Sequence, residues 1–252
     1  MPNLIFPTLT PDVSCETLSA LIGRPDAPPV FDLCLPEDFA ANPTIIPGAR
    51  RARHDDLPSL LDDINDPKDA CVIVCQKGRK ISQGAAAWLT ARGQKALFLA
   101  GGIDAWRAAH LPTVALTGMP KAGRNGAIWA LPNTPSLAVL QSAWIIKRWL
   151  DPRANVLYVD AAELTLVGEK FDAFTVDPES STKDMMSQFA LNAPRLDQWS
   201  VDLSKAPTRQ TLEVLLKGHL ALSHSMTDWQ DRSLSLLDAV YASQVQHAEV
   251  PA

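Results

Sequence analysis

The stretch ACVIVCQKGRKIS, residues 70–82, carries the clearest information about the fold of this chain. Residues 70–74 are apolar without interruption, which is typical of a strand buried on both faces of a parallel sheet. Cys75 ends that run, and the residues that follow it are Gln76, Lys77, Gly78, Arg79 and Lys80. The alanine-rich residues 82–92 then have helical spacing. The stretch therefore predicts a strand, a tight charged turn and a helix in direct succession.

Short apolar runs and helix-like segments alternate on both sides of this stretch. Further strands are predicted at residues 29–34 (PVFDLC) and 96–100 (ALFLA). Apolar residues recur at helical spacing in residues 14–22, 37–41, 57–64 and 103–109. This alternation predicts an α/β fold in which a parallel sheet is flanked by helices.

The sequence predicts a domain boundary at residues 111–126, LPTVALTGMPKAGRNG, where prolines and glycines interrupt all periodicity. We expect a first domain over 1–116, a linker over 117–126 and a second domain over 127–252. The second domain is predicted to be α-rich α+β. Its expected strands are residues 128–131, 155–159 and 170–175, and its expected helices cover 135–150, a segment from 161, and most of 182–246.

Composition places the chain among globular proteins, since 46% of its 252 residues are hydrophobic and 20% are charged. No apolar run approaches the roughly 18 residues of a membrane span, and the opening MPNLIFPTLT lacks the features of a signal peptide. These features predict a cytoplasmic protein without a membrane partner. Residues 127–252 carry 10 basic and 15 acidic side chains, so no nucleic-acid partner is expected.

The turn after Cys75 predicts a site for negative charge. A loop between a parallel strand and a helix directs backbone N–H groups and the helix dipole toward one point. A thiolate at Cys75 would be stabilised there, with help from Lys77, Arg79 and Lys80. Gly78 supplies the backbone freedom that such a loop requires. The alternative is that Cys75 is a buried structural thiol, as free cysteines often are.

The other cysteines are Cys15, Cys34 and Cys71. We expect all four to be reduced thiols in a cytoplasmic chain. Their spacing does not match a structural zinc pattern, so neither a metal nor another cofactor is predicted.

Several spaced motifs together resemble the rhodanese domain over roughly residues 10–113: PVFDLC (29–34), IPGAR (46–50), VIVCQKGRKIS (72–82), FLAGGIDAW (98–106) and HLPT (110–113). The resemblance implies a sulfurtransferase enzyme in which Cys75 is the catalytic nucleophile. Cys75 would take a sulfane sulfur from thiosulfate or a persulfide donor and pass it to a thiol, a protein acceptor or cyanide. Residues 76–80 would bind the anionic donor. This chain departs from the family in having Lys80 where arginine is usual.

Three more residues are candidates to support the loop: Asp32, Cys34 and Arg50. Cys34 stands where the family often has the arginine of a D-V-R triplet that begins at Asp32. It ends a strand expected beside the Cys75 strand, so it is either a resolving thiol or a small core residue. Arg50 begins a basic cluster, which is either a solvated face or a wall that guides anions toward Cys75.

Residues 127–164 resemble the C-terminal domain of the chromate-resistance protein ChrB, with weaker similarity to about residue 242. The matching positions are Trp129, Trp144, Ile146, Arg148, Asp151, Pro152, Phe171 and Asp172. The family's D-R pair is Ala138-Val139 here, and its cysteine is Ser142. The resemblance implies an alternative function, a regulatory protein of oxyanion stress that binds chromate in the Cys75 loop. In a purely structural interpretation, the apolar side chains of residues 144–150 are the buried face of one helix. A homodimer is a further option for the assembly.

Overall fold

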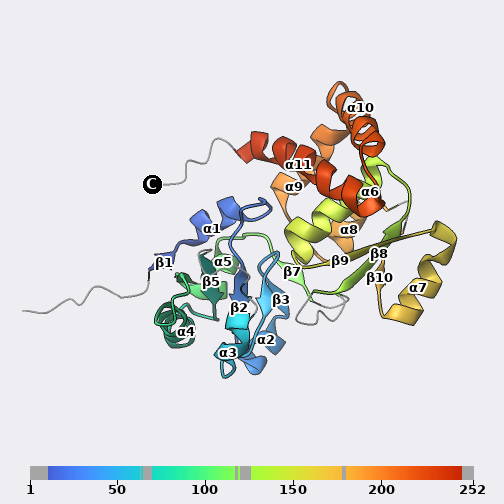
Figure 1. Cartoon of the computed structure of the whole chain (residues 1–252). Coiled ribbons are helices and arrows are strands. Elements are labelled where there is room, and N and C mark those ends of the chain that lie inside the picture. The colour runs from blue at the N-terminus through green and yellow to red at the C-terminus, as the bar shows by residue number, and fades with distance from the viewer. Residues whose placement is uncertain are drawn as a thin grey trace, which may run out of the picture. The chain divides into compact units, whose positions relative to one another are not determined.

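The computed structural model describes residues 11–62, 64, 70–116, 119, 126–177 and 180–245. The chain divides into two compact units, one made of residues up to 21 together with 26–112, the other of residues 22–25 and those from 113 onward (Figure 1). Most of the linker predicted at 117–126 lies outside the described residues. The domain boundaries at 116 and 127 therefore stay predictions.

The described residues of the first unit form a five-stranded parallel sheet with the order β1-β6-β5-β2-β4. Its strands are β1 Asp12–Val13, β2 Val30–Asp32, β4 Arg50–Arg51, β5 Cys71–Val74 and β6 Ala96–Leu99, while β3 Thr44–Ile45 lies outside it. The helices are α1 Cys15–Leu21, α2 Pro36–Ala41, α3 Leu57–Asp62, α4 Lys80–Thr90 and α5 Gly102–Ala108. Strand β5 is thus central, with β6 on one side and β2 on the other.

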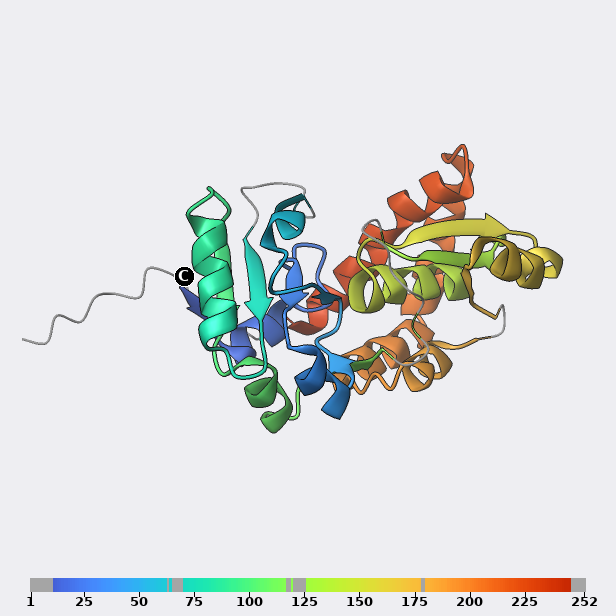
Figure 2. The ribbon, with the colours of Figure 1, turned by 90° about the horizontal axis from the view of Figure 1, so that it is seen from below.

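Strand β5 is buried on both faces, as its unbroken apolar sequence predicts. All four of its residues are buried. Cys71 and Ile73 pack into a core with side chains of α3 and α4, including Leu60 and Leu89. Figure 2 shows α4 running alongside β5. The predicted parallel sheet flanked by helices is confirmed, and the three predicted strands are β2, β5 and β6. The two-residue strands β1 and β4 were not predicted, because two residues are too few to show a period.

The second unit has a smaller sheet and more helix. Its described residues form a three-stranded parallel sheet with the order β10-β8-β9. Its strands are β8 Ile128–Pro132, β9 Asn155–Val159 and β10 Phe174–Thr175, and the short β7 Val114–Ala115 precedes them. Its helices are α6 Leu137–Ile145, α7 Leu164–Phe171, α8 Thr182–Gln188, α9 Pro194–Ser204, α10 Thr208–Ala221 and α11 Met226–Val245, with a π-turn at Ile146–Leu150 and a 3-10 turn at Ala161–Glu163.

Two predictions for this unit were wrong in detail. The helix expected from residue 135 begins at Leu137, because the Ser136 side chain accepts a hydrogen bond from the Val139 N–H and caps it. The strand expected over 170–175 is only β10, because α7 continues to Phe171 and ends where Asp172 adopts a φ of 51°. Apolar residues at a helix end and in a following strand resemble one continuous strand in sequence.

Helix α6 and its π-turn, which carry Trp144 and Trp149, form the core of the second unit. Trp144, Ile145, Ile146, Trp149 and Leu150 are all at most 3% exposed. Trp144 stacks on Trp199 at a centroid distance of 4.2 Å. Asp238 accepts hydrogen bonds from the Trp144 indole at 2.8 Å and from Arg148 at 2.9 and 3.0 Å. These contacts support the interpretation of residues 144–150 as a packed structural face.

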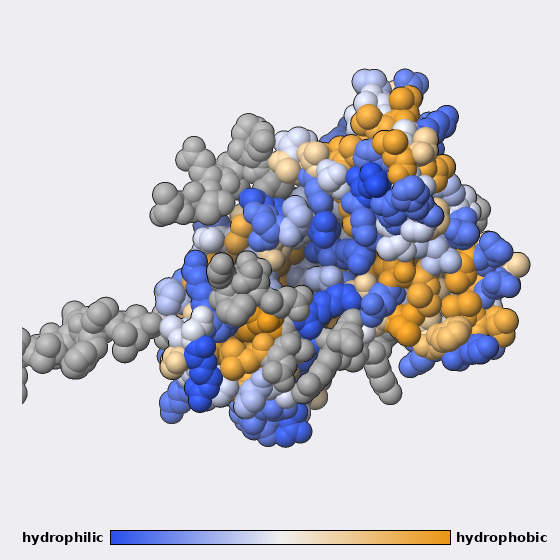
Figure 3. All heavy atoms as spheres, in the orientation of Figure 1, coloured by the Kyte–Doolittle hydropathy of each residue, from blue (hydrophilic) through white to orange (hydrophobic). Residues whose placement is uncertain are grey.

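The surface of the second unit carries apolar side chains over α7 (Figure 3). Leu166 is 60% exposed and Phe171 is 50% exposed. Surfaces of this kind often pack against a partner, and the homodimer that the sequence left as an option stays a hypothesis. Within the described ranges, no helix is both long enough and apolar enough to cross a membrane.

Candidate active site

Cys75 follows the last residue of β5, at the carboxyl end of the central strand. Its side chain is buried, with 5% exposure. Helix α4 begins five residues later at Lys80, so its N-terminus lies at the end of the short loop that starts at Cys75. The sulfur of Cys75 lies 3.1 Å from the hydroxyl oxygen of Ser82, a residue that is fully buried. The strand, loop and helix predicted from residues 70–82 are therefore confirmed, with a serine beside the thiol.

Two glycines hold the loop against the start of α5. Gly78 and Gly102 have φ values of +61° and +63°. A Cβ atom on Gly102 would lie 2.2 Å from the Cys75 carbonyl oxygen, and one on Gly78 would lie 2.4 Å from that of Leu99. The Ile103 N–H donates to the Cys75 carbonyl at 3.1 Å, and the Asp104 N–H donates to that of Gln76 at 3.0 Å. The CQKG and GGIDAW motifs are thus one backbone assembly, in which no other residue type fits at 78 or 102.

The charged residues of the loop point away from the interior. Lys77, Arg79 and Lys80 are exposed, whereas Gly78 is buried and Gln76 is half-buried. The Gln83 side chain donates to the Gly78 carbonyl at 3.2 Å and ties the loop to α4. The three cations of the loop therefore lie in solvent, where they attract anions by long-range Coulomb forces.

Asp32 lies on β2, the strand beside β5, and pairs with a residue of the edge strand β4. It is 2% exposed, and its carboxylate accepts the Cys34 N–H at 2.8 Å and Arg51 Nη1 at 3.3 Å. Arg51 lies on β4 and its guanidinium also stacks over Phe39 at 4.1 Å. Residue 34 is a cysteine here, where the D-V-R triplet has an arginine. The positive charge that pairs with Asp32 therefore comes from Arg51. Arg50, the predicted support residue, lies on β4, which is separated from β5 by β2.

The basic cluster that begins at Arg50 is largely paired with carboxylates. Arg51 is bonded to Asp32, and Arg53 donates to both oxygens of Asp55 at 2.9 and 2.6 Å. The hydrogen bond and charge of Arg53 lower the pKa of Asp55 to about 2. Arg53 thus lies on a solvated face, whereas Arg51 is half-buried against the buried Asp32. Pairing with carboxylates opposes a wall of free cations that guides anions.

Cys34 lies near Cys75, since the Leu33 N–H donates to the Val74 carbonyl at 2.8 Å and continues the pairing of β2 with β5. Burial raises the pKa of the Cys34 thiol, and the negative charge of Asp32 raises it further against the opposing effect of Arg51. A resolving thiol must lose its proton to attack another sulfur. The surroundings of Cys34 therefore oppose that role and favour the small core residue.

We expect Cys34 to react slowly with iodoacetamide at neutral pH, because its raised thiol pKa keeps it protonated. Peptide mass spectrometry after timed labelling measures each cysteine separately. Labelling of Cys34 should increase as pH rises, and at pH 7 it should be slower than labelling of Cys75. Equal rates at Cys34 and Cys75 at pH 7 would contradict this prediction and revive the resolving-thiol hypothesis.

Ser82 is the site residue that the sequence analysis missed. It lies in the first turn of α4, and its hydroxyl also lies 3.2 Å from the Arg79 carbonyl. A hydroxyl has one proton, so it can donate either to that carbonyl or to the sulfur. A thiolate can only accept, and deprotonation of Cys75 therefore draws the Ser82 proton toward the sulfur. Its position in the first helical turn after the loop is the feature of the sequence that could have identified it.

We expect Ser82→Ala to slow alkylation of Cys75 about tenfold at neutral pH, since a hydrogen bond to a charged group contributes about 1.5–3 kcal/mol. The measurement is the rate of Cys75 labelling in each variant. Ser82→Thr keeps a hydroxyl at this position and should restore much of the rate. A Ser82→Thr protein that is labelled as slowly as Ser82→Ala would indicate that the hydroxyl makes no contribution.

Comparison with known proteins identifies the first unit. Residues 14–109 match the family model described as rhodanese-like domain. A rhodanese-like domain protein from Staphylococcus aureus is 24% identical over 38% of this chain and 91% of its own, with a TM-score of 0.35. A thiosulfate sulfurtransferase from Pseudomonas aeruginosa is 27% identical over 42% of this chain and 19% of its own, with a TM-score of 0.37. No curated protein matches the chain.

The family match ends at residue 109, and the comparisons give no support to the resemblance between the second unit and ChrB. That resemblance stays a hypothesis from sequence. The motifs around Cys75, the parallel sheet and the family model agree over the same residues. Residues 14–109 of this chain are a rhodanese-like domain.

Proposed function

We propose that the protein is a sulfurtransferase that carries sulfur as a persulfide on Cys75. The observation that carries this proposal is the setting of Cys75, a thiol at the end of a central parallel strand, 3.1 Å from a buried serine hydroxyl. The interlocked glycines keep the loop in place, and its three cations are exposed. This setting supplies a nucleophile, a hydrogen bond for its anionic form and attraction for an anionic donor.

The reaction has two displacement steps at sulfur. The Cys75 thiolate attacks the outer sulfur of thiosulfate, a new S–S bond forms, and the old S–S bond breaks as sulfite leaves with the electron pair. The outer sulfur then stays on Cys75 as a persulfide anion. A thiolate or cyanide attacks that sulfur in turn, and Cys75 leaves as a thiolate. Donation from Ser82 to the Cys75 sulfur favours this thiolate both as nucleophile and as leaving group.

The partners we propose are a small anionic sulfur donor and a thiol, protein or cyanide acceptor. Lys77, Arg79 and Lys80 lie in solvent around the loop and favour a donor with negative charge. Lys80 has a compact charge and lacks the two parallel N–H groups of arginine. It therefore favours a sulfur donor that is attracted by charge over one that needs two hydrogen bonds of fixed geometry. All four cysteines are free thiols, which fits a reducing cytoplasmic setting.

Intact-mass spectrometry of the purified, reduced protein tests the proposal. After brief exposure to thiosulfate we expect a gain of the mass of one sulfur atom. Cyanide should then restore the original mass and release an equal amount of thiocyanate. If neither thiosulfate nor a small-molecule persulfide adds sulfur to the protein, the transferase proposal is wrong. Chromate binding to the loop would then be the next hypothesis to measure.

A further inference from the structure

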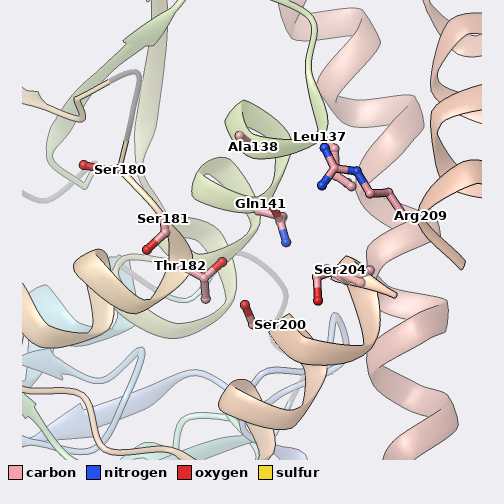
Figure 4. A pocket seen from close by; sticks show the side chains of 10 residues that line it. Leu137, Ala138, Gln141, Ser180, Ser181, Thr182, Ser200, Ser204 and Arg209 are labelled. Atoms are coloured by element: carbon pink, nitrogen blue, oxygen red, sulfur yellow. The ribbon is translucent and has the colours of Figure 1, made fainter. Parts of the chain in front are cut away.

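The second unit contains a cavity of about 320 Å³ between helices α6, α8, α9 and α10. Figure 4 shows this cavity, here called the α6–α10 cavity, with side chains from all four helices around it. Its volume lies at the lower end of the range of pockets that bind small molecules. The cavity is remote in sequence from the Cys75 loop and has no part in the proposed sulfur transfer.

Three polar side chains point into the α6–α10 cavity: Gln141 from α6, Thr182 from α8 and Ser200 from α9 (Figure 4). Thr182 is only 7% exposed. None of these three side chains forms a hydrogen bond with another of the described residues. Gln141 and Ser200 are half-buried. Polar groups that line a cavity and have no protein partner bind water or a ligand there. Their convergence therefore forms a set of donors and acceptors for a small polar molecule.

Charge narrows the class of ligand. Among the described residues that line the cavity, Arg209 is the only charged one. Its Nε donates to Glu213 at 2.9 Å, which leaves the two terminal nitrogens to meet a ligand. A single guanidinium beside neutral amide and hydroxyl groups suits one carboxylate better than a doubly charged phosphate. The hydroxyl-rich remainder of the lining suits hydroxyl groups on the same ligand.

We propose that the α6–α10 cavity binds a small hydroxycarboxylate. Its carboxylate pairs with the terminal nitrogens of Arg209, and its hydroxyl groups bond to Gln141, Thr182 and Ser200. Leu137 and Leu203 supply the apolar wall that contacts the carbon chain. This proposal is independent of Cys75, and its failure would leave the sulfurtransferase proposal unchanged.

Isothermal titration calorimetry of the full chain tests this proposal with D-glycerate, L-threonate and D-gluconate as probes. Glycerol and propionate serve as comparison compounds that have only the hydroxyls or only the carboxylate. We expect at least one of the three acids to bind more tightly than both comparison compounds. Arg209→Gln and Ser200→Ala should each weaken that binding about tenfold.

Matched variants separate the ligand contacts from effects on folding. Glu213→Gln removes the ion-pair partner of Arg209 without changing the lining, so binding should be retained or become tighter. Thr182→Val removes a hydroxyl at nearly constant volume and should weaken binding as Ser200→Ala does. The proposal is overturned if none of the acids binds the parent more tightly than the comparison compounds. It is also overturned if binding survives Arg209→Gln and Ser200→Ala undiminished.

Discussion

Cys75→Ser is expected to stop thiocyanate formation from thiosulfate and cyanide, leaving only the rate of the protein-free reaction. A serine hydroxyl stays protonated at neutral pH and is a poor nucleophile toward sulfur, so no covalent sulfur carrier remains. The substitution is nearly isosteric and keeps a hydroxyl beside Ser82, which preserves the packing of the loop. The measurement is thiocyanate release, with intact mass after thiosulfate as the second readout.

The matched control for this prediction is Cys15→Ser. Cys15 is a partly exposed thiol on α1, outside the loop. Its sulfur donates a hydrogen bond to the Ala100 carbonyl at 3.7 Å. That variant should load sulfur and release thiocyanate like the parent. Sulfur that still adds to Cys75→Ser at the parent's level would place the persulfide on another cysteine and refute the assigned nucleophile.

Gly102→Ala is expected to have the next largest effect on activity and stability, because it places a side chain against the backbone of the Cys75 loop. The added Cβ would lie 2.2 Å from the Cys75 carbonyl oxygen and 2.4 Å from the Gly78 nitrogen, and the φ of +63° is itself unfavourable for alanine. Backbone atoms cannot rotate away from such a contact. We expect the free energy of unfolding to fall by about 3 kcal/mol or more, together with a loss of sulfur loading on Cys75.

Gly84→Ala is the control for Gly102→Ala within the same region. Gly84 lies inside α4, and a Cβ there would meet nothing within 4 Å. Since glycine disfavours helix relative to alanine, this change should raise the free energy of unfolding by about 0.5–1 kcal/mol. Urea unfolding of both variants measures the two effects. A Gly102→Ala protein as stable as the parent would contradict the glycine contact described for the loop.

Local sequence was sufficient for much of the first unit. The unbroken apolar run before Cys75 predicts a strand buried on both faces, and β5 is central with every residue buried. The alanine-rich segment after it predicts α4, and the alternation of such units predicts a parallel sheet. These predictions succeed because side-chain burial and backbone propensity act over a few neighbouring residues.

The second unit was predicted less well, because one helix ends at an unusual backbone conformation and the helix core depends on contacts between distant residues. The extent of α7 is set by the αL turn at Asp172, and the place of Trp144 is set by Asp238, which is 94 residues away. The 3.6-residue hydrophobic periodicity of a helix and the packing partner of that helix are separate facts. Only the second of them distinguishes a structural tryptophan from a ligand-binding one.

For the candidate site, the sequence by itself determined the nucleophile candidate Cys75, the loop of residues 76–80 and the need for glycine at 78. The tertiary structure alone decided three other features: the contact of Ser82 with the sulfur, the replacement of a missing counter-charge by Arg51, and the packing of Gly78 against Gly102. The physical reason is distance along the chain. A strand, a turn and a helix follow from neighbouring residues, whereas hydrogen bonds and close contacts between segments exist only once the sheet has brought their ends to one edge.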